Sequence, residues 1–148
     1  MAKPVEILGH MRVSGGLDMR VQTVTQAARK SVQPAPVYAY SFAWRTPVLD
    51  GRLRAFHRSE LPFFFDNTDR CAHMTGGTAA ARSLAAKVSG ALIQCARTGN
   101  PNHSGLPHWP AFSVDETPTM VFDDRCEVKF DHDRAAREAY ERAAKPMS

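Results

Sequence analysis

The chain has 148 residues, of which 43% are apolar and 23% charged, a composition typical of a single globular domain and not of a disordered or membrane-spanning protein. The net charge is +4, but arginines and acidic residues are interleaved, so no basic stripe for a nucleic acid is expected. No apolar run approaches the roughly 20 residues of a membrane-spanning helix. Three unpaired-looking cysteines and a start without the apolar core of a secretion signal predict a cytoplasmic protein.

The first part of the chain is predicted to form a helix and then a strand. Asp18 can cap a helix that runs to about Lys30, and Pro34 and Pro36 prevent its continuation. The segment Val37–Trp44 alternates large aromatic residues with smaller ones, which is typical of a β-strand. Because both of its faces are largely apolar, we expect a strand buried between two layers of helices, as in an α/β sheet.

The middle of the chain is predicted to be loop and then helix. A polar loop contains His57, the short apolar stretch Leu61–Phe65 follows, and the breaker-rich segment Asp66–Gly77 is expected to be a surface loop. The strongest helix signal spans Thr78–Thr98, where Gly90 implies that another segment packs closely. Its apolar stripe is expected to consist of Leu84, Val88, Leu92 and Cys95.

The last part of the chain is predicted to contain a strand pair and a helix. Thr119–Phe122 and Glu127–Phe130 are two short strands that can pair across a polar turn. Asp133–Ala144 is predicted to be a helix, supported by Glu138 and Arg142 at a spacing of four residues.

His57 is the first candidate for chemistry. It follows the predicted buried strand, and α/β proteins place their sites in loops at the carboxyl ends of strands. A neutral imidazole there can take a proton from a serine hydroxyl and return it to a leaving group. From position alone, a loop histidine that only hydrogen-bonds to its neighbours is the simpler explanation.

Other groups of potential metal ligands lack recognised zinc spacing and fall in predicted loops. We therefore expect no metal site and no cofactor. These groups are Cys71 with His73, His103 with His108, and Asp131 with His132 and Asp133.

Several motifs occur in an order that resembles the C-terminal part of the type B carboxylesterases, the family of para-nitrobenzyl esterases and cholinesterases. In that family a strand leads to Gly-x-x-x-Ala-x-His-x-x-Glu-Leu and then to aromatic residues. Here Val37–Trp44 is the strand, Gly51–Leu61 is the motif and Phe63–Phe65 are the aromatics. The later matching segments are Ala96–Pro101, Trp109–Phe112 and Thr119–Phe122.

The resemblance implies an α/β-hydrolase fold and the hydrolysis of small-molecule carboxylic esters. It implies that His57 is the histidine of a catalytic triad and acts as a general base. Glu60 would then be a supporting residue near the loop. A carboxylate that satisfies local backbone donors or pairs with an arginine explains Glu60 more simply.

The rest of the triad is not recognisable in the sequence. An α/β-hydrolase carries its nucleophile in Gly-x-Ser-x-Gly, upstream of the acid and the histidine, and that motif does not occur here. Only Glu6 and Asp18 are acidic before Asp50, and the Gly-rich oxyanion loop is also missing. We therefore expect residues 1–148 to be a single partial domain, the C-terminal part of an α/β-hydrolase with an incomplete central sheet, and to be inactive alone.

An incomplete sheet has a structural consequence. A buried-type strand without its neighbours leaves an unpaired edge and exposed apolar surface. We expect Val37–Trp44 to be poorly covered, to pair at one edge at most, and to associate with a partner through this surface. Two functions therefore stay open: an ester-hydrolase segment that supplies the general base, or a non-catalytic remnant that acts as a binding module.

Overall fold

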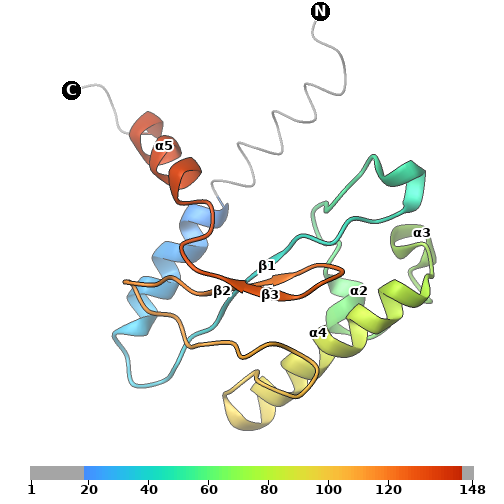
Figure 1. Cartoon of the computed structure of the whole chain (residues 1–148), viewed down its shortest axis with the longest axis horizontal. Helices are drawn as coiled ribbons and strands as arrows, with labels where there is room; N and C mark the ends of the chain where they lie inside the picture. Colours follow the sequence, from blue (N-terminus) through green and yellow to red (C-terminus); the bar gives the residue numbers. More distant parts are fainter. Residues whose placement is uncertain (1–18, 145–148) are drawn as a thin grey trace, which may run out of the picture.

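The computed structural model describes residues 19–144, so the predicted cap Asp18 lies outside the described part. A small sheet forms the middle layer (Figure 1). A helix over residues 19–31 covers one face, and the helices α2 (Leu61–Phe64) and α4 (Ala79–Thr98) cover the other. The predicted α/β class with an open, incomplete sheet is confirmed.

The sheet has three strands in the order β1 (Ala39–Phe42), β2 (Thr119–Phe122) and β3 (Glu127–Lys129). β1 and β2 are parallel, with Ala39 opposite Thr119, whereas β3 is antiparallel to β2. The predicted pairing of the two C-terminal strands is confirmed, and so is the pairing of β1 at one edge. The middle strand is β2, and all four of its residues are buried, whereas β1 lies at an edge of the sheet.

Alternate residues of the strands face the two helical layers, as the two-residue period of a strand requires. Met120 and Phe122 face α4, whereas Ala39 packs with Ala27 of the first helix. β1 is thus covered on both faces better than expected, although Tyr40 stays 40% exposed.

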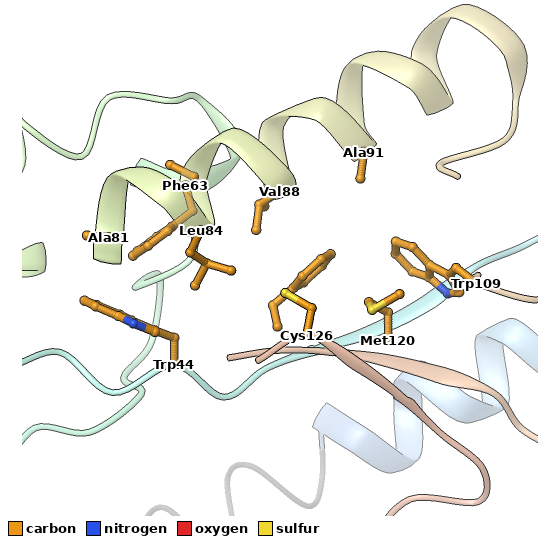
Figure 2. Packing of buried hydrophobic residues seen from close by; sticks show 11 residues of the cluster. Trp44, Phe63, Ala81, Leu84, Val88, Ala91, Trp109, Met120 and Cys126 are labelled. Carbon is orange, nitrogen blue, oxygen red and sulfur yellow. The ribbon is translucent and has the colours of Figure 1, made fainter. Parts of the chain in front are cut away.

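The main core lies between the sheet and α4 (Figure 2). The Thr78 hydroxyl accepts a hydrogen bond from the Ala81 N–H and so caps the helix, and Gly99 ends it in a left-handed conformation with φ 76°. The helix therefore has the predicted bounds. Its buried face consists of Ala81, Leu84, Ala85, Val88, Ser89 and Ala91.

The predicted apolar stripe of α4 is only half right. Leu84 and Val88 are buried, but Leu92 is 41% exposed and Cys95 is exposed as well. Small side chains such as Ala81 and Ala91 occupy the buried face instead, because they allow the helix backbone to approach the aromatic residues of the sheet.

The close packing expected at Gly90 is confirmed. A Cβ atom at Gly90 would lie 3.2 Å from the ring of His103. The His103 Nε2 atom lies 3.0 Å from the Lys87 carbonyl, and Nδ1 accepts the Gly105 N–H at 3.1 Å. Because Nδ1 is an acceptor, the proton of the neutral ring is on Nε2, which donates to the carbonyl. The imidazole thus fastens the loop after α4 onto the helix.

Replacement of His103 by alanine should lower the free energy of unfolding by about 1–2 kcal/mol, since two hydrogen bonds are lost. In that background Gly90→Ala should stabilise the protein by about 1 kcal/mol, the usual gain of alanine over glycine in a helix. In the unsubstituted protein that gain should be smaller, because the histidine ring stands in the way. Urea denaturation of the four variants measures this coupling, and equal effects of Gly90→Ala in both backgrounds would contradict it.

The segment Asp66–Gly77, predicted to be a surface loop, is more ordered than expected. It contains the short helix α3 (Ala72–Thr75), and Thr68 and Thr75 are 3% and 1% exposed. The Thr75 hydroxyl donates to the Thr68 carbonyl at 2.8 Å. Threonines can therefore be buried in a breaker-rich segment when their hydroxyl groups form hydrogen bonds within it. The polar composition of the segment does not reveal this burial.

The last helix, α5 (Arg134–Ala144), is confirmed where it was predicted. The carboxylate of Asp131 forms ion pairs with Arg137 and, at 3.3 Å, with Arg134, and these pairs hold the first turn of α5 in place. The predicted pair on the helix is present but long, with 3.9 Å between Arg142 Nη1 and Glu138 Oε2.

Candidate active site

His57 lies in a turn just before α2, on the connection that leaves the carboxyl end of β1. The residue is exposed, and among residues 19–144 its ring has no hydrogen-bonding or ionic partner. Four non-glycine residues of this connection adopt left-handed conformations: Leu49, Asp50, Arg54 and Arg58, with φ of 54°, 56°, 52° and 66°. Such conformations are uncommon for non-glycine residues, so they persist only where surrounding contacts define the path of the chain.

The contacts that define this path begin directly after β1. The Trp44 indole N–H donates to the Asp124 carboxylate at 3.0 Å. Two residues further, the Thr46 hydroxyl donates to the Met74 carbonyl at 2.6 Å and accepts the Val48 N–H at 3.2 Å. The connection is therefore tied to the β2–β3 turn and to α3 before it reaches the short 3-10 helix η1 (Val48–Gly51).

The far end of the connection is fixed by α2. Phe63 is fully buried, and its ring centre lies 4.9 Å from those of Phe42 and Trp44. Ser59, between His57 and α2, is also buried, and its N–H donates to the Phe56 carbonyl at 3.0 Å. The histidine thus stands on a short exposed turn between two anchored segments.

Glu60 begins α2 and is half-buried. Its carbonyl accepts the N–H groups of Phe63 and Phe64, and the structure shows no hydrogen bond between its carboxylate and His57. Burial, and secondly the nearby charge of Glu60, raise the pKa of Tyr40 on β1 above its usual value of 10.0. The charge of Glu60 therefore acts on Tyr40 of β1.

Replacement of Glu60 by glutamine should lower the pKa of Tyr40, because a negative charge next to the phenol opposes its ionisation. The pKa should stay above 10.0, since burial is the larger cause. The raised pKa of Tyr40 stabilises the folded protein at a pH below the pKa of this tyrosine in the unfolded chain. This stabilisation is lost as the pH rises through the pKa of Tyr40 in the folded protein. An NMR titration of ring-labelled tyrosine measures the shift. Glu141→Gln on α5 is the control, and an unchanged Tyr40 titration in Glu60→Gln would contradict the assigned proximity.

Tyr40 is the residue near the site that the sequence pattern did not single out. Its ring centre lies 5.2 Å from that of Phe64 on α2 and 5.8 Å from that of Phe122. The alternation along β1 already places Tyr40 on the same face as Phe42, and this signal could have indicated its place under α2.

Residues 19–144 contain no group of three histidine, cysteine, aspartate or glutamate side chains that could hold a metal ion. Within the same residues no helix is long and apolar enough to cross a membrane.

The sequence model of the carboxylesterase family matches residues 11–140, which is most of the chain. The chain belongs to the carboxylesterase family. The family segment includes β1, the His57 turn, α2 and α4, and both strands that follow.

Characterised relatives cover only part of this chain, and the chain covers even less of them. Phenmedipham hydrolase of Pseudarthrobacter oxydans is 38% identical over 93 residues, which are 60% of this chain and 19% of the hydrolase. Para-nitrobenzyl esterase of Bacillus subtilis is 32% identical over 106 residues, 70% of this chain and 21% of the esterase. The chain thus spans about a fifth of the length of these relatives.

Solved structures of esterases also match the fold of this chain. A thermophilic para-nitrobenzyl esterase matches 77% of this chain with a TM-score of 0.67 and 30% identity, and 23% of its own chain is covered. An esterase from Clostridium hathewayi, described as able to hydrolyse aliphatic aromatic polyesters, matches 73% of this chain with a TM-score of 0.65 and 35% identity, over 21% of its length. The fold is therefore a fragment of the α/β fold of these esterases.

Proposed function

We propose that this chain is the histidine-bearing part of a carboxylic-ester hydrolase and that its 148 residues form a single partial domain. The observation that carries the proposal is the position of His57, on an anchored turn after β1 inside a segment that belongs to the carboxylesterase family. The name of one relative, para-nitrobenzyl esterase, points to small-molecule esters as substrates.

His57 acts as the general base in this proposal. Its neutral imidazole takes the proton of a serine hydroxyl as the serine attacks the ester carbonyl, and it then returns the proton to the departing alcohol. The serine, the acid that orients the imidazole and the oxyanion hole belong to the part of the domain outside this chain. The exposed ring without a partner among residues 19–144 supports this division.

Glu60 has a supporting role. Its charge lies near Tyr40 and it begins the helix that holds the His57 turn, so it positions the turn and does not take part in proton transfer. The expectations that the protein is cytoplasmic and binds no nucleic acid remain predictions.

The isolated chain should not hydrolyse a para-nitrophenyl ester, because without a nucleophile and an oxyanion hole the imidazole has nothing to activate. The release of para-nitrophenol should equal that of the His57→Ala variant and of free imidazole at the same concentration. Release above those controls that disappears in His57→Ala would show that the chain is active alone.

The activity of the complete domain can be tested in a hybrid esterase. The hybrid esterase is the para-nitrobenzyl esterase of Bacillus subtilis in which the matching segment, 21% of its length, is replaced by the corresponding residues of this chain. The same serine and acid are then combined with His57. A folded hybrid esterase should hydrolyse the para-nitrophenyl ester.

A further inference from the structure

The connection between β1 and α2, which carries His57, is rich in exposed arginines. Apart from the histidine, its charged residues are four arginines and two acidic residues. All four arginines are exposed, whereas the acidic residue Glu60 is half-buried. The arginines are Arg45, Arg52, Arg54 and Arg58. The surface around the His57 turn therefore carries a net positive charge from this chain.

Three of these arginines have no partner within the described part of the chain. Among residues 19–144, the side chains of Arg45, Arg54 and Arg58 form no hydrogen bond or ion pair. Arg52 differs, because its Nε atom donates to the Leu49 carbonyl at 3.2 Å. An unpaired guanidinium can donate two parallel N–H groups to a carboxylate or a phosphate. Such a group is therefore available to an anionic ligand.

Two of the unpaired arginines lie close to His57 along the chain. Arg58 is the next residue, and Arg54 lies three residues before the histidine. Consecutive Cα atoms are about 3.8 Å apart, so the Cα atom of Arg54 is at most about 11 Å from that of His57. This separation is comparable with the Debye length of about 8–10 Å at physiological ionic strength. Both charges therefore act on an ester that reacts next to the histidine.

The backbone at these two positions does not favour arginine. Arg54 and Arg58 have φ of 52° and 66°, in the left-handed region that glycine adopts without steric cost. Strained backbone of this kind is concentrated at functional sites. The side chains are thus present where glycine would be the unstrained residue, which favours a use for their charges.

We infer that Arg54 and Arg58 make the complete hydrolase prefer esters that carry an anionic group, such as a carboxylate, on an apolar chain. Leu49 and Leu53, which are 57% and 37% exposed on the same connection, supply apolar surface for that chain. The arginines attract the ester and bind its anionic group, and they take no part in proton transfer. The inference rests on the proposed function, since it concerns the substrate of the His57 site.

Two esters that differ in one charge test the inference in the hybrid esterase. One is the mono-para-nitrophenyl ester of adipic acid. The other is para-nitrophenyl hexanoate, in which a methyl group replaces the carboxylate. The ratio of kcat/KM for the anionic ester to that for the neutral ester should fall by a factor of about 10 in Arg54→Gln/Arg58→Gln at low ionic strength. An unchanged ratio, including one in which both rates fall equally, would overturn the inference.

Two further variants and a change of salt separate charge from structure. Arg54→Lys/Arg58→Lys keeps both charges, so it should keep most of the preference for the anionic ester. Arg29→Gln/Arg97→Gln removes two exposed arginines outside the connection and should leave the ratio within about a factor of two. At 1 M salt, where the Debye length is about 3 Å, the effect of Arg54→Gln/Arg58→Gln should shrink. Equal effects of the two glutamine double variants would mean that only the total charge of the protein matters.

The failure of this inference and of the proposed function give different results. In a folded hybrid esterase that does not hydrolyse either ester, the role of His57 would be contradicted, but calorimetry could still measure the binding of both esters. The anionic ester should then bind more tightly, with a Kd that rises about tenfold in Arg54→Gln/Arg58→Gln. Hydrolysis of both esters with no effect of that variant on their ratio would support the proposed function and overturn the charge preference.

Discussion

Replacement of His57 by alanine in the hybrid esterase is expected to lower kcat for a para-nitrophenyl ester by a factor on the order of 10⁴ or more. The reason is that the serine hydroxyl loses the only group that can accept its proton, while binding and the oxyanion hole remain. Steady-state kinetics at neutral pH measures the loss. Because the ring is exposed and makes no hydrogen bond or ion pair among residues 19–144, the melting temperature should change little.

The matched controls are His73→Ala and His108→Ala, which remove exposed histidines outside the His57 turn. Both should keep the activity of the hybrid esterase within about a factor of two. A loss in either control as large as that in His57→Ala would mean that His57 has no special role. Full activity of the His57→Ala variant would mean that His57 is not part of the catalytic site.

Replacement of Phe122 by alanine should lower the free energy of unfolding of the chain by about 3–5 kcal/mol, the usual cost of truncating a buried phenylalanine. Phe122 is fully buried on the central strand, and its ring lies 5.7 Å from Trp109 and 6.3 Å from Phe64. The loss therefore affects β2, the loop before it and α2 together. Urea denaturation measures it, and a value below about 1 kcal/mol would contradict the packing described.

Phe130→Ala is the matched control for Phe122→Ala. The two residues are of the same type, but Phe130 is 57% exposed just after β3. Its replacement should change the free energy of unfolding by less than about 0.5 kcal/mol. A similar loss in both variants would indicate a general effect of removing an aromatic ring and not a specific core contact.

Local patterns predicted most of the elements of this fold. The bounds of α4 could be predicted because a capping threonine and a terminal glycine mark its two ends. The buried face of α4 could not be predicted, because alanines such as Ala81 and Ala85 contribute little to an apolar pattern. Leu92 contributes strongly to the pattern although it is exposed. A helix that approaches aromatic residues closely selects small side chains, and this depends on the partner surface.

The place of each strand in the sheet was harder to predict than its existence. β1 and β2 lie side by side although more than seventy residues separate them, and no local pattern indicates that these two strands pair. The same holds for the candidate site. The motif around His57 indicates the turn, but the proximity of Glu60 to Tyr40 arises only when α2 packs over β1.

The central claim is that His57 is the general base of an ester hydrolase whose other catalytic groups lie outside this chain. Hydrolysis of a para-nitrophenyl ester by the hybrid esterase tests it most directly, with the unmodified para-nitrobenzyl esterase as the reference. The account predicts hydrolysis by the folded hybrid esterase and its loss in His57→Ala. A hybrid esterase that melts cooperatively but does not hydrolyse the ester, or whose activity survives in His57→Ala, would contradict it.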